Sequence, residues 1–182
     1  MIKKALDFAY EAHKGQKRKG TDVPYMVHIF DVTKYLFYDN VPEEVVVAGI
    51  LHDTLEDSHT NKDELLQFGK EVIELVEFCS EPGNTVDAKD QKETWKERKL
   101  HSIESLDNAT RNQALVFLAD KLSNISAMRE DLLVIEDELW KRFNASKEEI
   151  EWYYKSVLEK LNIVDDTRMY KLFKVVVEEV FS

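Results

Sequence analysis

The chain has 182 residues, of which 43% are hydrophobic and 34% are charged, and its formal net charge at pH 7 is −11. This length and composition predict one soluble globular domain, covering residues 1–182, with enough chain for a substantial core. The acidic balance argues against a nucleic-acid-binding protein, because such proteins normally present a basic face. No apolar run reaches the roughly 18 residues of a membrane span, and the N-terminus lacks a signal-type apolar core, so a cytoplasmic protein is expected.

The charge is unevenly distributed along the chain. Residues 43–81 carry eleven acids against two lysines, whereas residues 13–20 carry four cations and no acid. Against so acidic a background, the cationic segment indicates either a local anion-binding site or a solvated basic turn. Cys79 is the only cysteine, which excludes an intrachain disulfide, fits a reducing compartment and is typical of a small buried side chain.

The apolar spacing is helical nearly throughout, and no convincing run of alternating strand residues occurs. Pro42 is placed to open one helix, Thr60 is the expected N-cap of another, and Ser146 begins a capping box with Glu149. Residues 81–84 form the clearest turn, and a polar stretch expected to be mobile follows it. The sequence therefore predicts an all-α fold with helices over residues 2–14, 25–38, 43–55, 60–79, 94–106, 110–129, 131–142, 147–161 and 166–181.

The last helix, at 166–181, is strongly amphipathic. Its apolar stripe comprises Met169, Leu172, Phe173, Val176, Val177, Val180 and Phe181. Such a stripe closes the core of a helical domain or meets a second subunit, and core packing is favoured here. A homo-oligomer therefore remains open.

Adjacent His52 and Asp53 end an apolar helical run and are the most informative pair in the chain. Neighbouring imidazole and carboxylate groups can bind one metal ion. Glu56 and Asp57 follow at i+4, so a continuing helix places all four side chains on roughly one face. The alternative that needs no metal is an ion pair between His52 and Asp53 at the C-terminal end of a helix.

Two further candidate ligands, His28 and Asp120, lie far away in sequence. Asp120 directly follows an apolar run, so it is expected to be buried and to need a cation or several hydrogen-bond donors. A lone histidine such as His28 is more often a hydrogen-bonded core residue, but one metal would explain all the groups together. Two imidazoles and two carboxylates suit octahedral Mn²⁺ or Fe²⁺ better than tetrahedral structural Zn²⁺.

Asn124 lies at i+4 from Asp120 and is expected on the same helix face, within reach of whatever the metal binds. Lys121 and Ser123 fall elsewhere on this helix and are expected to be surface or packing residues. The remaining histidines, His13, His59 and His101, have no comparable setting and are assigned no functional role.

These residues resemble a known family. His28, His52-Asp53 and Asp120, in this order, resemble the HD-domain superfamily of metal-dependent phosphohydrolases. The flanking segments 13–20, 51–57 and 118–124 are similar to the hydrolase domain of the RelA/SpoT family, and most of all to the small stand-alone alarmone hydrolases. The likeness covers residues 1–130 clearly and 131–160 loosely, and the ordered set of three blocks is far more specific than a bare His-Asp pair.

The resemblance implies removal of pyrophosphate from the 3′ position of (p)ppGpp. It implies that Mn²⁺, or Fe²⁺ or another divalent transition metal, is held by His28, His52, Asp53 and Asp120. It also implies that Glu56 and Asp57 position or activate the attacking water. The nucleotide contacts that it implies are Arg18 and Lys19 around the guanine, Asn124 on the nucleotide and Lys99 facing a phosphate.

The chain departs from the family pattern in places. Ile29 stands where the family usually has proline, and Ser126 and Ala127 occupy a region where many members have an arginine. Trp140 and Tyr154 are only candidates for stacking on the nucleotide.

Three alternatives stay open: an HD phosphohydrolase for another nucleotide, such as a 5′-nucleotidase, a degenerate nucleotide-binding sensor, and a structural metal-binding helical protein. The intact ligands with Glu56 and Asp57 disfavour degeneration. The basic loop at 14–19 disfavours a purely structural role.

Overall fold

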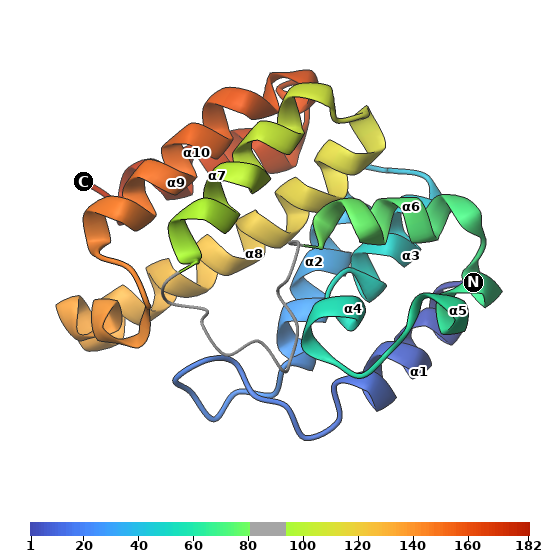
Figure 1. The fold of residues 1–182 in the computed structure, drawn as a ribbon. Helices are drawn as coiled ribbons and strands as arrows, with labels where there is room; N and C mark the ends of the chain where they lie inside the picture. Colours follow the sequence, from blue (N-terminus) through green and yellow to red (C-terminus); the bar gives the residue numbers. More distant parts are fainter. Residues whose placement is uncertain (81–93) are drawn as a thin grey trace.

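A computed structural model describes residues 1–80 and 94–182, and within these ranges the regular structure is helical (Figure 1). The predicted all-α fold is confirmed for these residues, which form one isolated β-bridge, between Lys17 and Pro24, and no strand. The α-helices are α1 (Ile2–Ala12), α2 (Met26–Tyr38), α3 (Glu43–Leu51), α4 (Thr54–Asp57), α5 (Lys62–Leu65), α6 (Lys70–Cys79), α7 (Trp95–Ser105), α8 (Arg111–Ile135), α9 (Lys147–Lys160) and α10 (Arg168–Val180). Short 3-10 segments span Leu66–Phe68, Leu106–Asn108, Glu136–Arg142 and Leu161–Val164.

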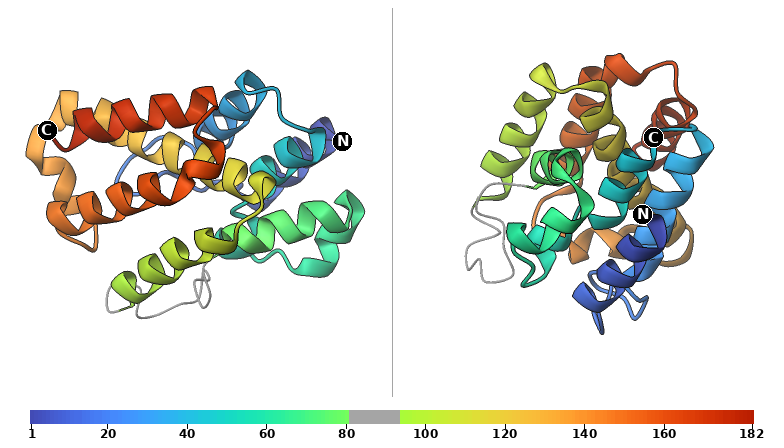
Figure 2. Two further views of the ribbon diagram at one scale, coloured as in Figure 1. Left: turned by 90° about the horizontal axis from the view of Figure 1, so that it is seen from above. Right: turned by 90° about the vertical axis from the view of Figure 1, so that its right-hand side faces the viewer.

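Helix α8 is the centre of the arrangement. It packs against α2, α3, α6 and α10, and in Figures 1 and 2 it runs between the N-terminal helices α1–α6 and the group formed by α7, α9 and α10. A capping box of Thr110 and Gln113 starts it, which satisfies backbone N–H groups that a helix leaves unpaired at its first turn. Its apolar residues 114–119 are all buried, so Asp120 directly after them is carried into the interior.

Helix α3 is short and buried along most of its length. Every residue from Val45 to Leu51 is buried, as the helix packs against α1, α2, α6 and α8. Gly49 lets α3 approach α2 closely, because a Cβ at this position would overlap Leu36 Cδ1 and lie 3.2 Å from Val32 Cγ1. The end of α3, where His52 follows, is thereby brought against the first turns of α2.

The C-terminal helix α10 packs against α8 and α9, and the favoured core role of this helix is confirmed. Its buried residues are Met169, Phe173, Val176, Val177 and Val180. The carboxylate of Asp39, at the end of α2, accepts hydrogen bonds from the backbone N–H groups of Arg168 and Met169 at 2.7 and 2.8 Å. This cap satisfies the first turn of α10 and ties it to α2. None of the helices in the described ranges is both long and apolar enough to cross a membrane.

The continuous helix expected over residues 43–55 is wrong. Helix α3 ends at Leu51 and α4 begins at Thr54. The hydroxyl of Thr54 donates a hydrogen bond of 2.7 Å to the carbonyl of Leu51, and such side-chain bonds to the backbone compete with helix continuation. His52 and Asp53 therefore occupy a break between two helices.

Two other boundaries differ from the expectation. The helix predicted over 60–79 is interrupted at Gly69, whose φ of +98° is incompatible with a right-handed helix, and Asn61 rather than Thr60 caps its first part, in a box with Glu64. The two helices predicted at 110–129 and 131–142 are one helix up to Ile135, followed by a 3-10 segment. The capping box of Ser146 is confirmed, and the turn expected at 81–84 lies outside the described residues.

Candidate metal centre and nucleotide cavity

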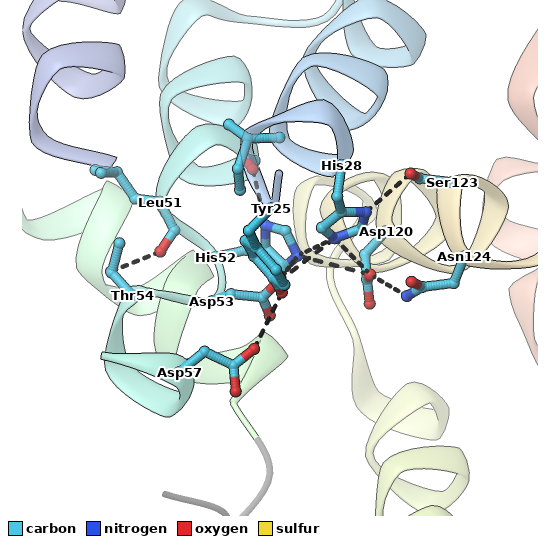
Figure 3. A network of polar contacts seen from close by, with 12 residues as sticks. Tyr25, His28, Leu51, His52, Asp53, Thr54, Asp57, Asp120, Ser123 and Asn124 are labelled. Atoms are coloured by element: carbon cyan, nitrogen blue, oxygen red, sulfur yellow. Dashed lines mark hydrogen bonds and ion pairs between the residues drawn. The ribbon is translucent and has the colours of Figure 1, made fainter. Parts of the chain in front are cut away.

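Two histidines from different helices face each other in the interior. His28 on α2 and His52 after α3 are each 2% exposed, and their Nε2 atoms are 3.2 Å apart (Figure 3). The other ring nitrogens are engaged: Nδ1 of His52 donates to the carbonyl of Gly49 at 2.9 Å, and Nδ1 of His28 lies 2.8 Å from Ser123 Oγ. The bond to Gly49 places a ring proton of His52 on Nδ1, so that in the neutral imidazole Nε2 offers a lone pair to the shared point.

Two carboxylates complete the cluster. Asp120 Oδ1, from α8, lies 3.3 Å from Nε2 of His28 and 3.6 Å from Nε2 of His52. Asp53 Oδ2 lies 3.4 Å from Nε2 of His28 and 2.8 Å from Nε2 of His52. Ligand atoms of His28, His52 and Asp120 all lie within 4.8 Å of one another, and Asp53 adjoins them through both imidazoles. The four ligands predicted from the sequence are thus adjacent.

The electrostatics of the cluster are those of buried charges that stabilise one another. Burial acts to lower the pKa of His52, but the carboxylates of Asp53 and Asp120 outweigh it and hold that pKa well above its ordinary value. Burial acts to raise the pKa of Asp120, while the ammonium group of Lys121 and the two imidazoles hold it well below its usual range. The charged imidazole of His52 lowers the pKa of Asp53 in the same way, against burial.

The donor atoms fit a divalent metal ion. Two nitrogen ligands at about 2.1 Å from one ion are about 3.0 Å apart at a right angle and about 3.4 Å apart at a tetrahedral angle, and the Nε2 atoms here are 3.2 Å apart. Two nitrogens and two carboxylate oxygens form the mixed donor set that first-row divalent metals accept. Both imidazoles are oriented by hydrogen bonds at Nδ1, the ring nitrogen that points away from the shared point, and such bonds are typical of metal-binding histidines.

Asp57 joins the cluster through a tyrosine. The hydroxyl of Tyr25 donates a hydrogen bond to Asp53 Oδ2 and lies 3.0 Å from Asp57 Oδ2, so that Tyr25 connects Asp57 to the predicted metal ligand Asp53 (Figure 3). Burial, followed by the charge of Asp53, raises the pKa of Asp57 to about 6. Glu56 lies half-buried on the same short helix.

Helix α8 supplies contacts that support Asp120. Asn124 Nδ2 donates to Asp120 Oδ1 at 2.6 Å, as expected for a residue at i+4, and Lys121 Nζ lies 2.6 Å from Asp120 Oδ2. Asn124 Oδ1 accepts a hydrogen bond of 2.7 Å from Arg18 Nη2. The basic loop between α1 and α2 is therefore linked to the cluster by two hydrogen bonds.

A cavity of about 450 Å³ opens beside the cluster. His28, Tyr25 and Asp57 lie in one part of its lining, and the predicted nucleotide contacts Arg18, Lys19, Lys99 and Asn124 also line it. Tyr153 and Tyr154 contribute aromatic wall, with Lys99 Nζ 5.1 Å from the centre of the Tyr153 ring. Trp140 is not among the lining residues and packs instead against Phe181, with ring centres 5.9 Å apart.

Sequence reasoning missed four members of this site. Ser123, expected to be a surface or packing residue, is 2% exposed and orients His28. Tyr25 connects the two aspartates, and His13, assigned no role, is buried and stacks on Tyr25 with ring centres 4.7 Å apart. Lys121 is also no ordinary surface residue, since its ammonium group is paired with Asp120. His13, Lys121 and Ser123 lie within the segments 13–20 and 118–124 that resemble the family, but helical spacing alone gives these residues no role in the site.

The profile described as the HD domain matches residues 5–150. The chain belongs to the HD-domain family. Membership places a divalent metal at a His-Asp site of this kind, and His28, His52 and Asp120 form a set that could bind one.

Individual relatives agree with this assignment. The chain is 34% identical over 153 residues to a guanosine-3′,5′-bis(diphosphate) 3′-pyrophosphohydrolase of Aquifex aeolicus, and 37% identical over 125 residues to the mouse protein of that name, MESH1. These matches cover 84% and 66% of this chain, but only 20% and 65% of the two relatives. The solved structure of a metazoan SpoT orthologue, which hydrolyses ppGpp, has the same fold, with a TM-score of 0.73 at 24% identity over 99% of this chain and 93% of that one.

Proposed function

We propose that this protein is a metal-dependent phosphohydrolase that removes pyrophosphate from the 3′ position of guanosine-3′,5′-bis(diphosphate). The observation that carries the proposal is the convergence of two imidazoles and two carboxylates beside a cavity that is lined by His28, Asp57 and cationic and aromatic side chains. The named activity of the relatives supports the choice of substrate.

His28, His52, Asp53 and Asp120 would hold the metal. A bound divalent ion neutralises charge on a phosphate oxygen and lowers the pKa of a bound water. We propose Mn²⁺, with Fe²⁺ as the alternative, because the donor set mixes nitrogen and oxygen. The free thiol of Cys79 is consistent with a reducing compartment, and we propose the cytoplasm.

Asp57 would accept the proton of the attacking water. Its carboxylate lies on the cavity wall, and a pKa of about 6 suits a general base that works near neutral pH. Glu56, on the same turn of α4, would orient that water or stabilise its charge. Neither acid is needed as a metal ligand in this assignment, because four ligands already converge.

The nucleotide would occupy the remainder of the cavity. Arg18 presents a planar multi-donor cation that is suited to a purine base, and its guanidinium is held in place by Asn124. Lys99 supplies compact positive charge for a phosphate oxygen, and Lys19 does so for a phosphate or base oxygen. These cations reduce the electrostatic cost of bringing a multiply charged nucleotide to a protein of net charge −11.

In the proposed reaction, the oxygen of water forms a bond to the phosphorus attached to the 3′ oxygen, and the bond between that phosphorus and the 3′ oxygen breaks. The 3′ oxygen takes up a proton and leaves as the hydroxyl of GDP, while pyrophosphate is released. The nucleotide and water together supply every atom of the products.

The test is a substrate panel. Mn²⁺-loaded protein is incubated with ppGpp, AMP and dAMP, and the products are separated and identified. The proposal expects GDP and pyrophosphate from ppGpp, with a kcat/KM well above that for either monophosphate. Release of inorganic phosphate from a 5′-monophosphate, with ppGpp untouched, would establish the nucleotidase alternative instead. Binding of ppGpp without turnover would establish the sensor alternative.

A further inference from the structure

The loop between α1 and α2 holds Asp57 by its main chain. The side-chain amide of Gln16 donates a hydrogen bond to the backbone carbonyl of Asp57, across 41 positions of sequence. The same amide contacts His13, whose Nδ1 lies 2.8 Å from Gln16 Oε1. Because the NH₂ group of Gln16 is committed to Asp57, its oxygen faces His13.

This arrangement fixes the tautomer of His13. An amide oxygen only accepts hydrogen bonds, so Nδ1 of His13 must carry the proton and donate it to Gln16. The imidazole is 2% exposed, and among the described residues no group hydrogen-bonds to its Nε2. A buried polar atom without a partner is unusual. The imidazole of His13 therefore acts through two contacts: the hydrogen bond from its Nδ1 to Gln16 and the packing of its ring face on Tyr25.

The face of His13 supports Tyr25. The two rings stack at 26° with centres 4.7 Å apart. The hydroxyl of Tyr25 then contacts both carboxylates, donating to Asp53 Oδ2 and lying 3.0 Å from Asp57 Oδ2 (Figure 3). His13 thus contacts both residues that hold Asp57. Gln16 bonds the main-chain carbonyl of Asp57, and the hydroxyl of Tyr25 contacts its carboxylate.

We infer that His13, Gln16 and Tyr25 form a positioning network that fixes the carboxylate of Asp57 relative to the metal ligand Asp53. This inference rests on the proposed function, in which Asp57 serves the attacking water. None of the three residues is assigned to bind the metal. The network holds the proposed proton acceptor at a set position relative to Asp53, and misplacement of about 1 Å at such a point can cost a factor of about 100 in rate.

The first test removes one oxygen atom. Tyr25→Phe keeps the stacking on His13 and deletes the hydroxyl. The inference expects unchanged metal content, a KM for ppGpp within about twofold of wild type, and a kcat lower by about 10- to 100-fold. Tyr35→Phe is the matched control, because Tyr35 lies on α2, of which Tyr25 is the N-cap, is buried and bonds Ser126 through its hydroxyl at 3.3 Å. The control should keep wild-type kcat.

A double-mutant cycle separates positioning from general support of the fold. If Tyr25 acts through Asp57, then Tyr25→Phe in the Asp57→Asn background should change the single-turnover rate by less than about threefold. Independent multiplication of the two effects would overturn the inference. Loss of metal in Tyr25→Phe would also overturn it, since Tyr25 would then serve Asp53 alone.

A second variant gives a readout that does not depend on turnover. Gln16→Ala should speed hydrogen exchange at the amide of Asp57, which bonds the carbonyl of Asp53 at 2.8 Å, and should lower kcat while metal content stays unchanged. Unchanged exchange together with unchanged kcat would contradict the network. Wild-type protein that fails to hydrolyse ppGpp removes the proposed function and this inference with it, whereas active wild type with fully active Tyr25→Phe removes the inference alone.

Discussion

Arg18 and Asn124 lie 106 positions apart in the chain, yet Arg18 Nη2 donates a hydrogen bond of 2.7 Å to Asn124 Oδ1. The other end of the same amide donates to Asp120 Oδ1 at 2.6 Å. One side chain therefore joins a cation of the cavity wall to a carboxylate of the proposed metal site. Nucleotide binding and metal binding are expected to be coupled through this amide.

Asn124→Ala should weaken both kinds of binding. Loss of the bond to Asp120 is expected to lower metal affinity by about 10- to 100-fold, as for other residues that orient metal ligands. Loss of the bond to Arg18 should raise the KM for ppGpp. Asn112→Ala is the matched control, because Asn112 lies near the start of α8 and its amide contacts Glu71. A variant with raised KM and unchanged metal affinity would make Asn124 a nucleotide contact only.

Asp120→Ala should remove the metal. Elemental analysis of the wild-type protein is expected to give about one equivalent of a transition metal, since the four ligands surround one point. The variant also leaves the ammonium group of Lys121 without its carboxylate partner, which further disfavours a cation near this position. Asp166→Asn, at an exposed ion pair with Arg111, should keep the metal. Full metal content in Asp120→Ala would exclude Asp120 from the site.

The sequence predicted those features of the site that depend on neighbouring residues within one segment of the chain. His52 and Asp53 follow a buried apolar run, and Asp120 follows another. A polar residue directly after such a run is predicted to be carried into the interior. The helical periodicity that defines these runs also predicted the all-α fold. The i+4 relation between Asp120 and Asn124 is a local property of one helix, and the hydrogen bond between them follows from it.

The remainder depends on how helices cross, which spacing along the chain does not specify. Ser123 faces His28 only because α8 and α2 cross at that point. Tyr25 and His13 acquire their contacts because the loop between α1 and α2 folds back over α4. The break after Leu51 is accompanied by one hydroxyl bond of Thr54, in an apolar pattern that is otherwise compatible with a continuous helix.

Activity should fall as the pH drops through the pKa of Asp57. A general base must be in its carboxylate form, and burial with the charge of Asp53 raises the pKa of Asp57 to about 6, so protonation below that pH removes the base. A bound cation favours the carboxylate, which places the acidic limb of kcat at or below about pH 6. The profile is measured with metal content determined at each pH, since protons also compete for the histidines. An acidic limb that persists unchanged in Asp57→Asn would assign it to another group.

Gly49→Ala should destabilise the fold at the base of the metal site. The added methyl group would overlap Leu36 Cδ1 and crowd Val32, and such overpacking typically costs about 1–3 kcal/mol in the free energy of unfolding. Separation of α3 from α2 also displaces the carbonyl of Gly49, which orients His52, so metal affinity should fall as well. Denaturant unfolding in the presence of a chelator measures the first effect, and metal titration the second.

The cause of that destabilisation can be isolated with a compensating change. Leu36→Ala alone removes a fully buried side chain and should cost about 2–5 kcal/mol through the cavity it leaves. In Leu36→Ala/Gly49→Ala the new methyl group occupies part of that cavity without the overlap, so the double variant should be less destabilised than the sum of the single variants. Simple additivity would show that Gly49 is required for a reason other than the close approach of α3 to α2. Recovery of metal affinity in the double variant would show that this approach sets the distance between His28 and His52.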